Sequence, residues 1–280
     1  MTRRPRVAVV GHVEWLEIAR VGQVPRQGEI VHARASMHEV GGGGAVAAVQ
    51  LSRLAGECDF FTALGNDELG RRAKARLEAL GVHVLAAERP EPQRRAFVFT
   101  DDQAERTITV IGERIGPKRD DPLPWEDLAE VDAVYFTAGD VDAVRAARRA
   151  HRLVATPRAI DVLAEAAAGI DVLVSSAGDP GEQYHPGDLE PPPGIVARTA
   201  GAEGGTLTGS DGRTGSWNAA PLPGRPVDSY GAGDSFAAGL TWGLALGRSA
   251  DEAAAIGARC GAACMAGHGP YEGQLHGPVG

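Results

Sequence analysis

Short apolar runs of strand length alternate with alanine-rich segments whose apolar residues recur at helical spacing. Because these two periods distinguish strands from helices, the pattern predicts both kinds of element along most of the chain. The predicted strands are 6–10, 58–64, 82–86, 133–137, 152–155 and 171–175, and the predicted helices are 45–55, 68–80, 141–150, one that ends near 168, 235–246 and 250–266. Such alternation is typical of βα units wound around a largely parallel sheet, so we predict an α/β fold.

Two stretches break this rhythm, residues 29–38 and residues 94–112. In the second, strand-like runs at 95–100 and 106–111 flank a polar turn, which predicts a β-hairpin. An antiparallel patch inserted into a wound α/β domain has one face that only substrate or a second subunit can cover. We therefore predict a lid formed by about residues 13–38 and 94–112. The proline-dense segment 186–193 is predicted to be a surface loop.

Residues of the predicted strand 95–100 alternate between two faces. Ala96, Val98 and Thr100 fall on one face, and Arg95, Phe97 and Phe99 fall on the other. Because two exposed phenylalanines would be an apolar liability on a monomer, we predict a homodimer through the lid.

Composition narrows the class further. The 280 residues are 43% hydrophobic and 23% charged, which suits a single folded domain over 1–280 and excludes disorder. A formal net charge of -9 disfavours a broad cationic face for nucleic acid, so small-molecule partners are expected. Three cysteines make a disulfide framework improbable, and no apolar run is long enough for a membrane span or a secretory signal. These features predict a cytoplasmic protein.

The strongest chemical signal lies in the segment 228–240. Gly231, Ala232 and Gly233 open a predicted helix, where small side chains leave backbone N–H groups free at the positive end of the helix dipole. Asp234 follows in the first turn. Phosphoryl transfer to an alcohol needs both features, a base for the hydroxyl proton and donors for the moving phosphoryl group. The alternative is a first-turn aspartate that only complements the dipole.

The motif Asp228-x-x-Gly-Ala-Gly-Asp resembles the C-terminal signature of the PfkB/ribokinase family of carbohydrate and nucleoside kinases. Four more motifs resemble that family and follow its order: Gly41-Gly-Gly-Gly-Ala-Val-Ala-Ala-Val-Gln-Leu-Ser-Arg-Leu-Ala-Gly, Gly65-Asn-Asp-Glu-Leu-Gly, Glu105-Arg-Thr-Ile and Thr199-Ala-Gly-Ala-Glu-Gly. The resemblance covers nearly the whole chain. It implies a three-layer α/β/α ribokinase-like domain with a small β-sheet lid.

The resemblance also implies roles for individual residues. Asp234 becomes the catalytic base, with an anion hole formed by Gly231, Ala232 and Gly233. The implied substrate-binding residues are Glu14, Gly41, Gly42 and Arg106, and the implied residues of the ATP site are Thr199, Gly201, Gly204 and His268. Plain alternatives stand beside these roles: a flexible turn at 41–44, β-turn glycines at 201 and 204, a loop histidine at 268 and a solvated residue at 14.

Departures from the family pattern leave the metal and the substrate class open. Val46 stands near the place of a sugar-binding asparagine, and Ser175-Ser-Ala-Gly-Asp-Pro-Gly-Glu replaces the Asn-x-x-Glu motif that organises Mg²⁺. Asp179 or Glu182 is the predicted substitute, since Mg²⁺ in such sites is held largely through water and phosphate oxygens. The resemblance also allows a monovalent cation near Asp228.

Together these observations predict an ATP-dependent kinase that transfers the γ-phosphoryl group to a hydroxyl of a sugar or sugar-like alcohol, with Mg²⁺. A nucleoside kinase is the alternative enzyme, favoured by Val46 and by Trp15, whose ring would stack on a base. A catalytically weak binding or regulatory protein is the alternative of another class, favoured by the missing Asn-x-x-Glu. Neither the P-loop motif nor G-x-G-x-x-G is present, so other nucleotide-binding folds are not supported.

Overall fold

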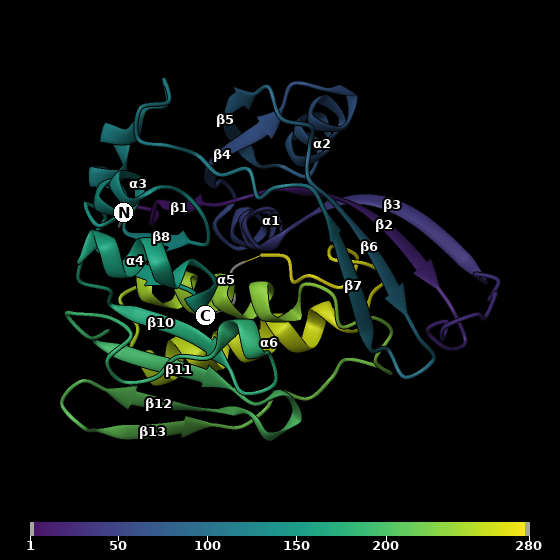
Figure 1. The fold of residues 1–280 in the computed structure, drawn as a ribbon. Helices are drawn as coiled ribbons and strands as arrows, with labels where there is room; N and C mark the ends of the chain where they lie inside the picture. The colour runs from purple at the N-terminus through teal and green to yellow at the C-terminus, as the bar shows by residue number, and fades with distance from the viewer. Residues whose placement is uncertain (1–2, 278–280) are drawn as a thin grey trace.

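The computed structural model describes residues 3–277. Two β-sheets organise this part of the chain (Figure 1). The larger sheet has nine strands in the order β13-β12-β11-β10-β9-β8-β1-β4-β5. Their bounds are β1 Val7–Val10, β4 Asp59–Gly65, β5 His83–Arg89, β8 Ala133–Phe136, β9 Leu153–Ala155, β10 Val172–Ser176, β11 Ile195–Thr199, β12 Gly205–Gly209 and β13 Thr214–Trp217.

Every strand pair from β11 to β5 is parallel, whereas β12 and β13 add an antiparallel ladder at one edge. Each crossover between parallel strands passes over a face of the sheet, which brings helices to both faces. The helices are α1 Gly43–Ala55, α2 Glu68–Ala79, α3 Val141–Ala147, α4 Ile160–Ala166, α5 Ala232–Ala245 and α6 Ala250–Cys264. This architecture confirms the predicted three-layer α/β/α fold.

Alternation along β1 shows how the sheet separates two cores. Val7 and Val9 pack into a cluster with residues of α1, α2, α5 and α6, whereas Ala8 and Val10 pack into a second cluster with residues of α3 and α4. All four side chains are buried. A strand buried on both faces reads as a continuous apolar run, which is why 7–10 is recognisable in the sequence.

Local signals fix the ends of the helices. Asp67 caps α2 by accepting a hydrogen bond from the N–H of Gly70, and Ser249 forms a capping box with Glu252 at the start of α6. Gly56 ends α1 in the left-handed conformation, at φ 82°. These three signals mark where the helices begin or end, and each can be read from the local sequence.

The smaller sheet is the predicted lid. Its order is β3-β2-β6-β7, with β2 Glu14–Arg20, β3 Ala35–Gly41, β6 Arg95–Thr100 and β7 Arg106–Ile111. The four strands extend away from the body of the molecule (Figure 1). Ala96, Val98 and Thr100 are buried while Phe97 and Phe99 are half-buried, so the predicted alternation of faces is confirmed.

The first part of the lid differs from the prediction. The stretch 29–38 is not one strand, because residues 21–34 connect β2 to β3 and β3 continues to Gly41. The strand β2 was missed altogether. Its first residues, Glu14-Trp-Leu, are buried where the lid joins the body, so they lack the polar–apolar alternation that marks a half-covered strand.

Within the part of the chain that the structure describes, no helix has the length and apolar content to cross a membrane.

Candidate active site

The carboxyl ends of the parallel strands meet at one edge of the large sheet, where open α/β sheets bind their ligands. Residues 11–14 follow β1, Arg158 follows β9, residues 179–182 follow β10 and residues 200–204 follow β11. The order of the strands reverses at β1, which pairs with β4 on one side and β8 on the other. The predicted site residues are therefore gathered by topology rather than by sequence proximity.

Asp234 lies in the first turn of α5, and Gly231 caps the helix in the left-handed conformation at φ 82°. Removal from water raises the pKa of the Asp234 carboxyl to about 7, and the nearby negative charge of Glu182 contributes to the rise. The positive charges of Arg158 and Arg106 act in the opposite direction. A carboxylate whose pKa lies near neutrality suits a general base.

The space beside Asp234 is open at Gly233. A Cβ built on Gly233 would meet nothing within 4 Å, and this residue is exposed. Its backbone N–H belongs to the first turn of α5, whose donors have no partner within the helix. Of the predicted anion hole, Gly233 thus faces free space beside the predicted base, whereas Gly231 is buried against Val46 and the N–H of Ala232 donates to the carbonyl oxygen of Ser229 at 3.4 Å.

The glycine run 41–44 brings the start of α1 against the same place. A Cβ on Gly43 would lie 2.8 Å from Oδ1 of Asp234 and 3.8 Å from Cε1 of His12. The N–H of Gly42 donates to the hydroxyl of Tyr230 at 3.1 Å, and a Cβ on Gly42 would lie 3.0 Å from the backbone nitrogen of Glu14. The structure therefore brings Gly42 and Glu14 close to Asp234.

Glu14 is buried rather than solvated. Its Oε1 lies 2.8 Å from Nε of Arg94 and 3.7 Å from Nε2 of His12. Desolvation lowers the pKa of His12 well below its usual value, and the charges of Arg114, Arg94 and Arg158 lower it further, so this imidazole is neutral. The plain alternative for Glu14, a solvated residue, is wrong.

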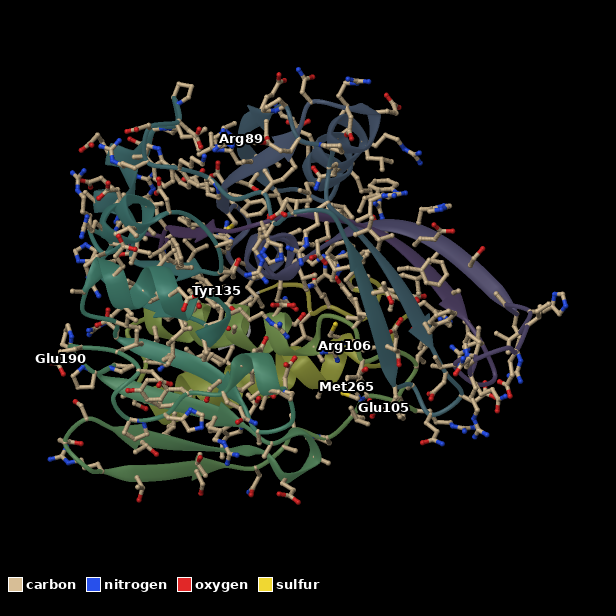
Figure 2. All side chains as sticks on the ribbon, in the orientation of Figure 1. Arg89, Glu105, Arg106, Tyr135, Glu190 and Met265 are labelled. Carbon is tan, nitrogen blue, oxygen red and sulfur yellow. The ribbon has the colours of Figure 1, made fainter. Side chains whose placement is uncertain are left out.

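Arg106 reaches from the lid to the segment that leads into α5. Its Nη1 donates to the carbonyl oxygen of Ser229 at 3.2 Å, and the neighbouring N–H of Asp228 donates to the carbonyl oxygen of Met265 at 3.4 Å. Figure 2 shows Arg106 and Met265 in this region. Arg106 therefore connects the lid to the segment that precedes α5.

The predicted nucleotide turn, residues 199–204, lies at the other end of the edge. A Cβ on Gly204 would approach the carbonyl oxygen of Trp217 to 2.1 Å, so this glycine is required by packing whatever it binds. Next to Trp217, Asn218 lines a hollow of about 440 Å³ whose other wall is α6, including Ala255, Ile256 and Ala258. The hydroxyl of Thr199 donates to the carbonyl oxygen of Ser175 at 3.2 Å.

Asp179 and Glu182, the predicted metal residues, both pair with Arg158; Nε of Arg158 lies 2.7 Å from Oε1 of Glu182. His268 lies elsewhere, in the turn after α6, where its N–H donates to Glu272 at 2.6 Å. The adjacent Gly269 approaches Met37 and Ile18 of the lid. The contacts of this turn are thus with Glu272 and with the lid.

Sequence reasoning missed four residues of this site: His12, Arg94, Arg114 and Arg158. His12 follows a recognised strand, but the three arginines are far apart along the chain and belong to no motif. Only the pairing of β6 with β7 and the position of β9 in the sheet bring them together. The available signal was that Arg94 and Arg114 flank the predicted hairpin.

Comparison with known proteins identifies the family. The sequence model of the pfkB family of carbohydrate kinases matches residues 4–176 and 192–276. The chain belongs to this family. Phosphoryl transfer to a carbohydrate hydroxyl, the predicted class of reaction, is thereby confirmed.

Individual relatives agree with this assignment. The chain is 27% identical over 258 residues to an ATP-dependent ribose-1-phosphate kinase of Halopiger xanaduensis, covering 85% of this chain and 84% of the relative. The fold is similar to that of Arabidopsis thaliana ribokinase complexed with ribose and ATP, with a TM-score of 0.77, 20% identity and coverage of 98% and 96%. It is equally similar to Sinorhizobium meliloti adenosine kinase, with a TM-score of 0.77, 18% identity and coverage of 96% of each chain.

Proposed function

We propose that this pfkB kinase transfers the γ-phosphoryl group of ATP to a sugar hydroxyl placed between the lid and the N-terminus of α5. The observation that carries the proposal is the position of Asp234. Its carboxyl, with a pKa of about 7, lies against Gly43 on one side and one residue from the open N–H of Gly233 on the other. A base and an anion hole in one place are what phosphoryl transfer requires.

The reaction then proceeds in line. The acceptor oxygen forms a bond to the γ-phosphorus as the bond to the β–γ bridging oxygen breaks, and ADP leaves with that oxygen. Asp234 takes the hydroxyl proton, so the products are the phosphorylated sugar and ADP. The N–H groups at 231–233 stabilise charge on the transferring group, while Arg106 and the lid exclude water from it.

The nucleotide fits the carboxyl-terminal edge of the large sheet near residues 199–204, away from the proposed sugar position. We assign its base to the hollow beside Asn218 and α6, because Gly204 of the nucleotide turn lies against the backbone of Asn218, which lines that hollow. The triphosphate would then run past Gly201 to the N-terminus of α5. The relative named for ATP-dependence supports ATP as donor.

Mg²⁺ fits the carboxylates after β10 by the chemistry of hard oxygen donors. Of the two, Glu182 has the stronger claim, because its charge acts on Asp234 whereas Asp179 accepts a hydrogen bond from the N–H of Gly181 within its own turn. When bound, Mg²⁺ neutralises charge on the phosphate oxygens. Glu182 would hold it largely through water and phosphate.

A monovalent cation near Asp228 remains a prediction. The carboxylate of Asp228 already accepts hydrogen bonds from the N–H groups of Tyr230 at 2.9 Å and Gly269 at 3.2 Å. Activity measured in K⁺ and in tetramethylammonium buffers of equal ionic strength would test it.

An activity assay can identify the class of phosphoryl acceptor. Trp15 is not free to stack on a nucleobase, because it is buried and the guanidinium of Arg72 lies 4.7 Å from its ring centroid. This removes one reason for a nucleoside kinase. ADP release should be measured over matched sugars, sugar phosphates and nucleosides, since the relative named above acts on a sugar phosphate. If none of these acceptors stimulates ADP release, the catalytically weak binding protein is supported instead.

Catalysis should depend on the ionisation of Asp234. Since the pKa of this carboxyl is raised to about 7, we expect kcat/KM to fall about tenfold per pH unit below pH 7, as the base becomes protonated. Glu182→Gln removes a charge that raises this pKa and should move the acid limb to lower pH, although the variant is slower. An acid limb at the same pH in both proteins would assign it to another group.

The outer face of the lid is proposed as a homodimer contact. Phe97 and Phe99 pack edge to face with ring centroids 4.9 Å apart, and both are half-buried. Their cross-strand neighbours on this face are Glu17, Ala19, Thr109 and Thr107. A second copy meeting this face through a two-fold axis would cover the rings.

Sedimentation tests this contact. We expect a dimer at micromolar concentration that Phe97→Asp dissociates, because a charge buried in an apolar contact without a partner is strongly unfavourable. Arg145→Asp, on the exposed surface of α3, is the control and should leave the dimer intact. A monomeric wild type would disprove the contact.

A further inference from the structure

Three arginines converge at the base of the lid, on the substrate side of the site. Arg94 precedes β6 and Arg114 follows β7, and a Cβ on Gly112 would lie 3.9 Å from Cα of Arg94. Arg158 comes from the end of β9, and its carbonyl oxygen accepts a hydrogen bond from Nη1 of Arg114 at 3.2 Å. Three separate segments thus bring three arginines close together, and the charges of all three act on His12.

Three carboxylates accompany the three guanidinium groups, but their distribution is uneven and leaves Arg114 without a carboxylate partner. Arg94 pairs with Glu14, and Arg158 pairs with Asp179 and Glu182. Among the ion pairs of residues 3–277, none involves Arg114, whose side chain bonds only a backbone carbonyl. Desolvation and the charges of Arg94 and Arg158 lower the pKa of Arg114, and the charge of Glu14 offsets only part of this effect. An anion placed here would relieve this repulsion.

The arginines are connected to the catalytic base by a short series of contacts. Asp234 and His12 both lie against Gly43, His12 lies 3.7 Å from Glu14, and Glu14 pairs with Arg94. The charge of Arg158 also acts on Asp234. An acceptor that lies along Glu14 and neutral His12 would have one end at Asp234 and the other at the arginines.

We propose that Arg94, Arg114 and Arg158 bind the phosphate group of the acceptor, so that the substrate is a sugar phosphate and the product a sugar bisphosphate. This inference rests on the proposed function and names its substrate class. A phosphate offers three terminal oxygens to guanidinium groups that bind such oxygens in planar, paired geometry. A carboxylate offers two, and a neutral sugar leaves Arg114 uncompensated.

Matched acceptors test the proposal. With ATP and Mg²⁺, we expect kcat/KM for a pentose or hexose phosphate to exceed that for the free sugar by at least about 100-fold, since the free sugar makes none of the charge-assisted hydrogen bonds of the phosphate. Arg114→Met should raise KM for the sugar phosphate about 10–100-fold with a smaller change in kcat. It should leave KM for the free sugar unchanged. Arg145→Met is the control for loss of a surface arginine.

The outcomes separate this inference from the proposed function. The phosphate site would be overturned, while the kinase assignment stands, by a preference for free sugars or sugar acids. It would also be overturned if Arg114→Met had the same effect on a sugar phosphate and on the matching free sugar. If no acceptor leads to ADP release, the kinase assignment fails. Calorimetry with inorganic phosphate then tests whether the three arginines form a phosphate site. At least tenfold weaker binding by Arg114→Met than by wild type supports the site, and equal binding overturns it. Arg114→Lys, which keeps the charge, should bind phosphate better than Arg114→Met.

Discussion

Replacing Asp234 by asparagine is expected to lower kcat by about 10²–10⁴-fold, the usual effect of removing a positioned general base. The amide keeps the shape of the side chain against Gly43 but cannot accept the hydroxyl proton. The affinity for ATP should change little, because the nucleotide is assigned to the hollow beside α6 and to the turn at 201–204. Single-turnover kinetics and nucleotide binding measured on the same protein give both quantities.

Stability provides the control for Asp234→Asn. Because the folded-state pKa of Asp234 is raised to about 7 from 3.8, ionising this group destabilises the folded protein, and stability is lost as pH rises through that range. The variant should therefore melt at the same temperature as wild type or higher at pH 8. Asp251→Asn, in the first turn of α6 outside the site, should keep full activity. Turnover by Asp234→Asn within a few-fold of wild type would rule out the base.

The sequence predicts the wound domain well because its elements are marked locally. β1 is a continuous apolar run, and α1 ends at Gly56 in the left-handed conformation. The strand β6 alternates between buried and half-buried positions, so its faces are also predictable, whereas every residue of β7 is exposed. β2 was missed because its buried start at the lid stem, Glu14-Trp-Leu, does not alternate.

Some residues of the candidate site can likewise be predicted from local sequence, and others cannot. Gly231 to Asp234 form a contiguous motif, and the structure places them together at the start of α5. Arg94, Arg114 and Arg158 carry no such mark, because their convergence is a property of strand order and of hairpin register. Burial is equally invisible locally: Glu14 looked like a residue that water might reach, yet it is enclosed with Arg94 and His12. Local pattern thus predicts the end of the site that we propose to be catalytic, and topology alone reveals the end that we propose to select the acceptor.

Replacing Gly233 by valine should lower kcat by about 10²–10³-fold, the range observed when one donor of an anion hole is lost. A Cβ at this position meets nothing within 4 Å in the free protein, so the side chain is tolerated by the fold and obstructs only an arriving phosphoryl group. Valine is no worse than glycine in a helix, so the melting temperature should stay close to that of wild type. Gly233→Ala, with a single methyl group, should show a smaller loss. An unchanged kcat with a lowered melting temperature would instead make Gly233 a packing residue and move the anion hole away from the start of α5.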